Sequence, residues 1–317
     1  MRLIVCPLAV LAFATATVAY SQNYPTRPVR IVTAGVGGSS DFASRVIAQA
    51  ISGPLGQQVI VDNRPSGVIP GEIVAKSPPD GYTLLVSSNL LWIQPFLRGN
   101  MPYDAARDFL PISQTNRQPS LVVVHPSLPV RTMKEFIALV KARPGELNYA
   151  AGAIGSQDHL AAELFKSMAH VNIVGIFYKT GATRMADLVG GHVQLSFSTG
   201  GTVMPHVRSG RLRALAVTSA QPTPLAPGIP TVAASGVPGY EAIQILGVFA
   251  PARTPAAIIG RLNQEIVRAL GEHEVKERFL SSGVETVGTS PEEFAAVIGS
   301  DSAKWERLIK ATGIRAD

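Results

Sequence analysis

Short apolar runs alternate along the chain with stretches in which apolar residues recur at helical spacing. In the first third the order is strand, helix, strand, helix, strand, which builds a parallel sheet covered on both faces. The predicted segments are strands 30–34, 58–61 and 82–87 and helices 41–51 and 71–76. A further apolar run at 121–124 predicts another strand, closed by His125-Pro126.

The middle of the chain repeats this alternation. Thr132 is predicted as the N-cap of a helix ending at Ala142, with Glu135 in the capping-box position. The other predicted elements are strands 147–150, 173–178, 193–198 and 214–218, a helix ending at Met168, and helices 185–189 and 204–208. Closely spaced prolines between 221 and 239 predict a surface loop.

The last part of the chain contains one apolar strand and then helices without a sheet of their own. The strand is 244–250, and the helices are 255–270, 274–281, 291–298 and 301–312. Because these helices need a sheet to cover, we expect them to pack on the first α/β set. The predicted fold is therefore α/β with two lobes joined by at least two crossings. Lobe 1 comprises residues 22–124 and 245–317, and lobe 2 comprises residues 125–244.

The amino terminus has the pattern of a secretory signal peptide. Met1-Arg2 is followed by an apolar run to about Ala19 and by small residues. We predict cleavage after Ser21, with Ala19 as the alternative, and export to the periplasm. A membrane anchor is the rival interpretation, but the run is barely long enough to span and no charged stop follows it. Cys6, the single cysteine, lies in this segment, so disulfides, thiolate metal sites and a cysteine nucleophile are excluded.

Charge and motifs exclude several classes of function. The chain has 28 Lys+Arg against 22 Asp+Glu, scattered without a basic stripe, so nucleic-acid binding is set aside. A mildly positive surface favours anionic solutes. The sequence has neither a Gly-x-Ser-x-Gly elbow nor a His-Glu-x-x-His helix, and no pair of histidines has metal-ligand spacing. We therefore predict no catalytic residue, no metal site and no cofactor.

Two glycine-bearing turns, each between a strand and a helix, are the main candidate chemistry. The first contains Gly37, Gly38, Ser39 and Asp41. Glycines let the backbone approach a guest closely, and the free N–H groups of a helix N-terminus attract anions. The alternative is a plain tight connection with Ser39 or Ser40 as N-cap. The second turn repeats the design with Gly155, Ser156, Asp158 and His159, so two facing lobes would bring both turns into one cleft.

A dinucleotide-dependent enzyme is the strongest alternative of another class, and an exported hydrolase is a weaker one. The run from Gly35 to Ser40 follows a strand and opens a helix, and Asp62 ends the next strand, where a ribose-binding acid would lie. However, Ser40 stands where the fingerprint has its third small residue. Export also takes the protein to a compartment where nicotinamide cofactors are scarce.

An ordered set of motifs along the mature chain resembles one known family. The motifs are Tyr24-Pro25 with Arg27-Pro28-Val29, Gly37-Gly38-Ser39 with Asp41, Val61-Asp62-Asn63-Arg64-Pro65, Pro79-Asp80-Gly81-Tyr82-Thr83-Leu84, Pro102-Tyr103-Asp104 with Asp108-Phe109, His125-Pro126-Ser127-Leu128-Pro129, Leu147-Asn148-Tyr149, the run from His159 to Phe165, Tyr178-Lys179, the run from Leu212 to Thr218, Pro230-Thr231-Val232 and Pro238-Gly239-Tyr240-Glu241. In this order they resemble the Bug-type periplasmic solute-binding receptors of tripartite tricarboxylate transporters.

The resemblance implies a two-lobed fold like that of type II periplasmic binding proteins, with a hinge and an interlobe cleft. It implies a monomeric receptor, not an enzyme, that closes on a small organic solute, usually a carboxylate, and delivers it to membrane permease subunits. The ligand-binding residues carried over are Gly37, Gly38, Ser39, Asp41, Ser87, Ser88, Asn89, Gly155, Ser156, Asp158, His159, Tyr178, Thr180 and Ser198. For Asp41 and His159 a structural role, as helix cap and interlobe orienter, stays open beside ligand contact.

The chain departs from the family pattern in the second turn. Asp158 stands before His159, where the family commonly has threonine. A carboxylate facing the cleft would repel an anionic ligand. We therefore expect Asp158 to tune ligand choice, with amino-bearing and aromatic solutes as alternatives to a simple dicarboxylate.

Overall fold

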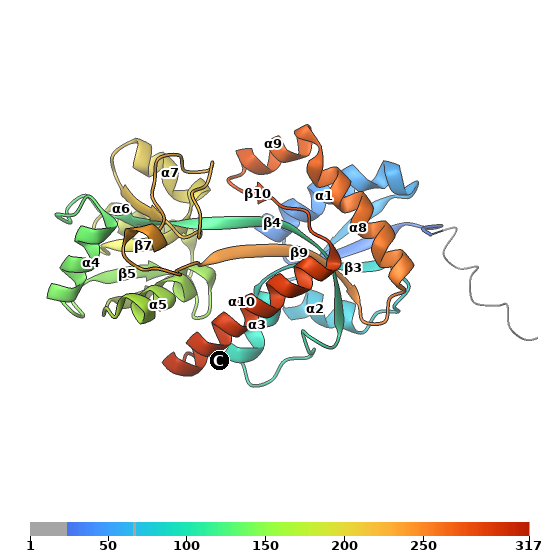
Figure 1. Cartoon of the computed structure of the whole chain (residues 1–317), viewed down its shortest axis with the longest axis horizontal. Coiled ribbons are helices and arrows are strands. Elements are labelled where there is room, and N and C mark those ends of the chain that lie inside the picture. The colour runs from blue at the N-terminus through green and yellow to red at the C-terminus, as the bar shows by residue number, and fades with distance from the viewer. Residues whose placement is uncertain (1–23, 66–67, 317) are drawn as a thin grey trace, which may run out of the picture.

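The protein is an α/β structure with two lobes joined by long strands (Figure 1). A computed structural model describes residues 24–65 and 68–316. The predicted signal peptide, residues 1–21, and its cleavage after Ser21 lie outside the described residues. Within the described ranges, no helix is long and apolar enough to cross a membrane.

Lobe 1 is built on three parallel strands, as the sequence predicts. The strands are β1 (Val29–Thr33), β2 (Val59–Asn63) and β3 (Thr83–Ser88), and the helices that follow them are α1 (Ser39–Leu55), α2 (Val68–Ala75) and α3 (Leu90–Leu97). β1 lies in the middle, paired in parallel with both neighbours. The β-branched residues of β1 are fully buried between the helical layers, the expected environment for a strand covered on both faces. α3 was not predicted, because it is only eight residues long and contains Pro95, and a proline inside a helix argues against one.

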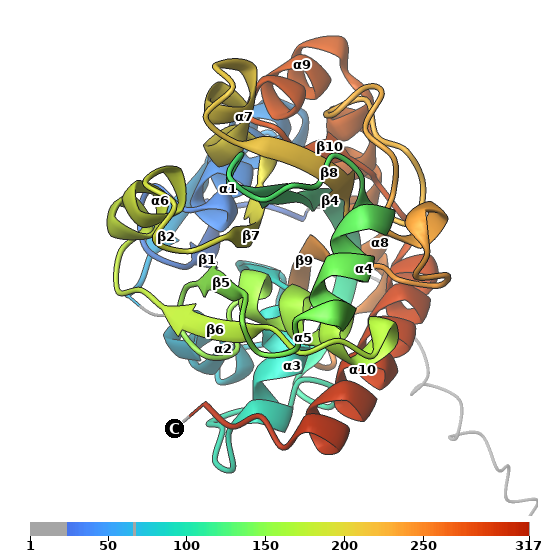
Figure 2. The same cartoon turned by 90° about the vertical axis from the view of Figure 1, so that its left-hand side faces the viewer.

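Lobe 2 repeats this plan. Its parallel strands are β5 (Asn148–Ala151), β6 (Val174–Phe177) and β7 (Leu195–Thr199), with β5 in the middle, and its helices are α4 (Met133–Ala142), α5 (Gln157–Ala169), α6 (Gly181–Val189) and α7 (Gly200–Arg208). Figure 2 looks onto this lobe. The predicted cap of α4 is confirmed: Thr132 accepts from the N–H of Glu135 at 3.2 Å, and the Glu135 carboxylate accepts from the N–H of Thr132.

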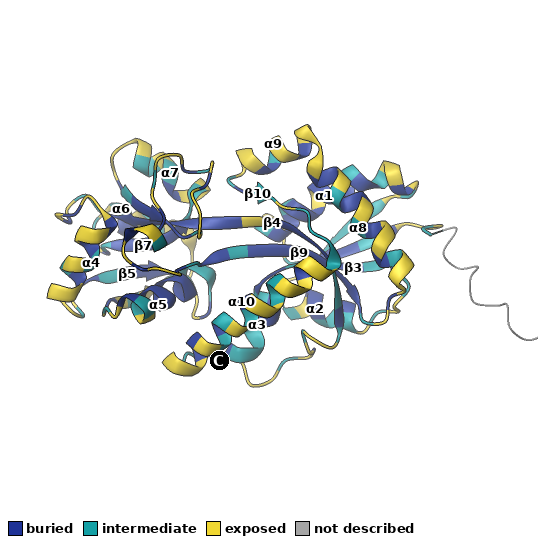
Figure 3. Ribbon diagram, viewed as in Figure 1, coloured by how far each residue is buried: buried dark blue, intermediate teal, exposed yellow. Residues whose placement is uncertain are grey.

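Two antiparallel strands cross between the lobes. They are β4 (Phe109–Val124) and β9 (Ile243–Pro251), and β8 (Arg213–Val217) pairs with β4 in lobe 2. The sheet order is β2-β1-β3-β9-β4-β7-β5-β6. The strand predicted at 121–124 is confirmed as the end of β4, but its first part, from Phe109, was not predicted, because Pro111 and the polar residues after it break the apolar pattern. The strand tolerates them because its register shifts at two bulges, between Pro111 and Ser113 and between Gln114 and Asn116. Both crossing strands are buried along most of their length (Figure 3).

The C-terminal helices pack on lobe 1, as predicted. The remaining elements are the 3₁₀ turn η1 (Ala233–Ser235), α8 (Ala256–Gly271), α9 (His273–Ser281), β10 (Glu285–Thr286) and α10 (Pro291–Thr312). The prediction of separate helices at 291–298 and 301–312 was wrong, because α10 runs unbroken through Gly299. A glycine inside a helix costs only about 1 kcal/mol relative to alanine. Burial of Phe294, Trp305 and Ile309 on the inner face of α10 offsets this cost.

Candidate functional site

The carboxyl ends of the two parallel strand sets face each other across the crossing strands. β3 ends at Ser88, which pairs with Leu246 of β9, and Leu246 in turn pairs with Asn116 of β4. β7 ends at Thr199, which pairs with Ser120 of β4. Along β4, only residues 117–119 therefore separate the position that aligns with the end of β3 from the position that pairs with the end of β7. Ligands of α/β sheets bind beyond the carboxyl ends of the strands, so this is the candidate site.

On lobe 1 the turn between β1 and α1 is fixed by Asp41. The Asp41 carboxylate accepts from the N–H of Gly37 at 2.9 Å and from Asn63 Nδ2 at 2.9 Å, and it pairs with Arg45 at 2.8 Å. Burial alone would raise the pKa of Asp41, but these donors outweigh it and hold the pKa below its usual range. Gly37 has φ +86°, a conformation that favours glycine. Asp41 is thus turned onto its own loop.

The alternative interpretation, with Ser39 or Ser40 as N-cap of α1, is wrong. The N-cap is Gly38, and Ser39 and Ser40 are already helical residues. The Ser39 hydroxyl donates to Gln244 Oε1 of β9 at 3.3 Å, and no side chain caps the first turn within the described part of the chain. The N–H groups that open α1 therefore stay free for an anion.

Of the polar residues predicted at the end of β3, two lie in the strand itself, and the third, Asn89, is buried and holds neighbouring elements together. Ser87 is half-buried, while the Ser88 hydroxyl accepts from the N–H of Leu90 at 3.4 Å. Asn89 is fully buried, and its amide nitrogen donates to the carbonyl of Ile243 at 3.2 Å and to Asp301 at 3.4 Å. The amide nitrogen of Asn89 thus joins β3 to β9 and α10.

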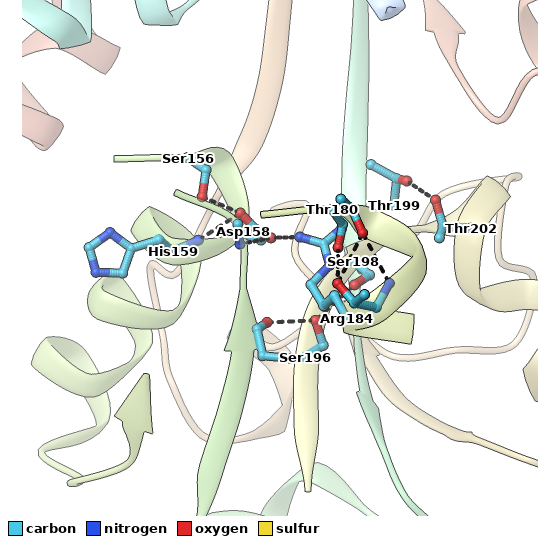
Figure 4. Close-up of polar contacts among 12 residues, drawn as sticks. Ser156, Asp158, His159, Thr180, Arg184, Ser196, Ser198, Thr199 and Thr202 are labelled. Carbon is cyan, nitrogen blue, oxygen red and sulfur yellow. Dashed lines mark hydrogen bonds and ion pairs between the residues drawn. The ribbon is translucent and has the colours of Figure 1, made fainter. Parts of the chain in front are cut away.

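On lobe 2 the turn between β5 and α5 is organised by Asp158 (Figure 4). Its carboxylate accepts from the N–H of Gly152 at 2.9 Å, from the hydroxyl of Ser156 and from its neighbour's backbone N–H. It also forms an ion pair with Arg184, which reaches over from α6. The repulsion expected from Asp158 does not follow, because Arg184 neutralises the carboxylate. The design matches lobe 1, where Asp41 is neutralised by Arg45.

Arg184 is the residue that sequence reasoning missed. The predicted helix began at 185, whereas α6 begins at Gly181 and places Arg184 in its first turn. A cation in the first turn of a helix interacts unfavourably with the helix dipole unless an anion is close to it. The position of Arg184 in the sequence could therefore have indicated an acidic partner. Arg184 also lines a cavity of about 450 Å³ together with Phe177 and Lys179. Its Nε is buried and has no hydrogen-bond partner among residues 24–65 and 68–316.

His159 holds the second turn in place through contacts with Gly155 and Phe177. Its Nδ1 accepts from the N–H of Gly155 at 3.0 Å, and its ring meets the edge of Phe177 with centroids 5.1 Å apart. Gly155 has φ +80°, and a Cβ there would lie 2.6 Å from the side chain of Leu97 in α3. The turn thus packs directly against lobe 1. These contacts give His159 a structural role in the turn.

Replacing His159 by asparagine should flatten the pH dependence of stability between pH 7 and 5. Burial lowers the pKa of His159, against the opposing charges of Glu163 and Asp158. Below about pH 6.5, the pKa of His159 in the unfolded chain, the unfolded chain binds a proton that the folded ring resists, so the free energy of unfolding falls as the pH falls. Above this pH, His159 does not change the free energy of unfolding. Urea unfolding at pH 5 to 8 measures this. Equal pH slopes for wild type and H159N would contradict the assignment.

The other predicted residues of lobe 2 lie at the ends of β6 and β7. The Tyr178 hydroxyl donates to Asp187 at 2.8 Å, and burial, with this bond and its charge, raises the pKa of Tyr178 to about 12. Thr180 caps α6 by accepting from the N–H of Thr183. Ser198 is buried and shares a 2.8 Å hydrogen bond with Ser196 of the same strand. Tyr178 and Thr180 line the same cavity as Arg184.

At three helix N-termini on these edges the N-cap side chain accepts from no N–H of the first turn in the described residues, and at α5 only the N–H of His159 is bonded by a side chain, that of Asp158. They belong to α1, α5 and α7, whose N-cap residues are Gly38, Ser156 and Thr199. The Ser156 hydroxyl bonds to Asp158 instead, and the Thr199 hydroxyl bonds to Thr202. By contrast, α4 and α10 begin with complete capping boxes. Free N–H groups therefore gather around the candidate site, an arrangement suited to anions.

Two lobes with facing strand ends, joined by crossing strands, define the class of two-lobed periplasmic solute-binding proteins. Within that class, residues 43–314 match the model of the tripartite tricarboxylate transporter family receptor, TctC, and the chain belongs to this family. It is 37% identical over 300 residues to the protein BugT of Bordetella pertussis, covering 93% of this chain and 92% of BugT.

Solved structures agree with the family. R. palustris Rpa4515 with adipate is 36% identical, with a TM-score of 0.78, covering 92% of this chain and 99% of that one. MatC (Rpa3494) from Rhodopseudomonas palustris, with bound malate, is 26% identical, with a TM-score of 0.74, covering 90% and 100% of the two chains. Members of this family are receptors, and the expected two-lobed α/β fold is confirmed.

Proposed function

We propose that this protein captures a small carboxylate between its lobes and delivers it to the permease subunits of a tripartite tricarboxylate transporter. The observation that carries the proposal is the gathering of uncapped helix N-termini at facing strand ends, beside the cation Arg184. The adipate and malate in two related structures support the same ligand class. Because Arg184 offsets the charge of Asp158, a dicarboxylate is the first ligand to test.

The binding residues divide into those that contact the ligand and those that position the contacts. Backbone N–H groups of Gly38 and Ser39 and the hydroxyl of Ser87 would contact the solute, whereas the N–H of Ser156 already donates to the carbonyl of Ala153 at 2.9 Å. Asp41, Asp158 and His159 would position the two turns, since their polar atoms already bond to the turn backbone. Backbone donors can hold an anion without consuming a full ion pair.

The lobes would close by bending the crossing strands. We place the hinge near Pro119 of β4 and Ile243 of β9, where β4 changes partners from β9 to β7 and β8. The first boundary between lobe 1 and lobe 2 would then lie a few residues before residue 124, where the sequence predicts it. We further propose export with cleavage after Ser21, a monomeric state, and binding without chemical turnover of the solute.

Ligand screening by thermal shift and calorimetry tests the proposal. Adipate and malate should raise the melting temperature of the purified protein, since a ligand that binds only the folded form stabilises it. Benzoate, glutamate and NAD serve as aromatic, amino-bearing and dinucleotide probes. Binding of NAD alone, or disappearance of a bound acid with formation of product, would overturn the proposal.

A further inference from the structure

A second cavity lies on lobe 1 and shares no lining residue with the cavity at Arg184. It has a volume of about 500 Å³, within the usual range for small-molecule sites. α3, the segment 98–106 and α10 enclose it. Its apolar wall includes Trp92, Phe96 and Ile298.

The wall formed by residues 103–109 is held rigidly. The Asp104 carboxylate accepts from the N–H of Arg107 at 3.0 Å, and Asp108 accepts from the N–H of Asp104 at 2.8 Å. This turn sets the Tyr103 ring against Phe109, with centroids 5.5 Å apart, and against Gly71, where a Cβ would fall 2.6 Å from the ring. The cavity is therefore preformed, which lowers the entropy cost of binding.

Two donors at this cavity are not used by the fold. The Tyr103 side chain is 6% exposed, and its hydroxyl has no hydrogen-bond partner among the described residues. A buried tyrosine hydroxyl usually has a partner, and one without it costs stability. Burial raises the pKa of Tyr103 to about 12, against the opposing positive charge of Arg98. Arg98 is exposed, and within the described ranges it forms no ion pair.

We propose that this cavity is a second ligand site, which binds a small amphipathic monocarboxylate. The apolar body would lie on Trp92 and Phe96, and the carboxylate would accept from the Arg98 guanidinium and the Tyr103 hydroxyl. The indole N–H of Trp92 is already donated to Asp301 at 3.0 Å, so Trp92 offers only its ring. A guanidinium provides only donors and carries a positive charge, so the site selects an anion over an amine.

Calorimetric titration of the purified protein with octanoate tests this site, with octylamine and 1-octanol as cationic and neutral probes. We expect octanoate to bind at least tenfold more tightly than either probe. R98Q and Y103F should each weaken octanoate binding at least tenfold, while the exposed control R131Q should not change it. Y103F should also be no less stable than wild type, because the hydroxyl it removes has no partner in the free protein.

R184Q separates this site from the cavity that residues of lobe 2 form around Arg184. Octanoate affinity should stay within twofold of wild type in R184Q, because the two cavities share no residue. The proposal is overturned if octanoate does not bind the wild type, if R98Q and Y103F both bind it unchanged, or if R184Q abolishes its binding. None of these three results depends on whether adipate or malate binds between the lobes.

Discussion

Replacing Arg184 by glutamine is expected to weaken binding of a dicarboxylate by about 100-fold, or about 2.7 kcal/mol. The change removes the cation at the cavity and also leaves the Asp158 carboxylate without its partner. Both effects make the site more negative. Truncating one member of a buried charge pair typically costs about 2–5 kcal/mol, much of it from the charge left behind. Calorimetry with adipate, on protein checked for folding by circular dichroism, measures the change.

A double variant separates the two contributions. If the unpaired carboxylate causes most of the loss, D158N combined with R184Q should recover about tenfold of the affinity. R143Q is the matched control, because Arg143 forms an exposed ion pair with Glu146 before the amino-terminal end of β5, whereas the site lies beyond the carboxyl end of that strand. It should leave affinity within about twofold, since exposed pairs contribute little. Dicarboxylate binding by R184Q within threefold of wild type would refute the role of Arg184.

Local pattern predicted the elements that build each lobe. The βαβαβ order and the capping box at Thr132 follow from residues that interact with near neighbours in the chain. The packing of the C-terminal helices on lobe 1 is a long-range contact, and it was predicted only because these helices have no sheet of their own. The long strand β4 could not be predicted, because Pro111 and its polar successors are accommodated by bulges against β9, more than a hundred residues away. Periodicity reports on neighbours in sequence, and partners that distant leave no trace in it.

The same limit applies to the site. The two glycine turns are evident in the sequence, but the orientation of their carboxylates is not. The sequence predicts that Asp158 repels an anionic ligand, but in the structure Arg184, 26 residues further along the chain, pairs with its carboxylate. The carboxylates of both turns point back to their own backbone N–H groups. Sequence identifies which groups are present, and the fold decides which of them are already neutralised.

A buried carboxylate in α10 holds the scaffold of lobe 1 together. Asp301 is 5% exposed, and it accepts from the indole N–H groups of both tryptophans of the chain, Trp92 and Trp305, each at 3.0 Å. It also accepts from the amide of Asn89 at 3.4 Å and pairs with Lys304 at 2.8 Å. Asn89, the N-cap of α3 directly after β3, and Trp92 of α3 are thus joined to α10 by one side chain. The cost of burying the charge is met by four donors.

Replacing Asp301 by alanine should therefore lower the free energy of unfolding by about 3–5 kcal/mol, because it leaves two indoles without partners, removes one of the two acceptors of the Asn89 amide and leaves a cation without its anion. Urea unfolding followed by tryptophan fluorescence measures this directly, since both indoles report on the change. D301N, which keeps an acceptor but loses the charge, should lose about half as much. E306Q on the exposed face of the same helix removes only the surface pair with Lys310 and should cost under about 0.5 kcal/mol. A loss below about 1 kcal/mol in D301A would mean that packing of α10, and not this polar network, fixes the helix to lobe 1.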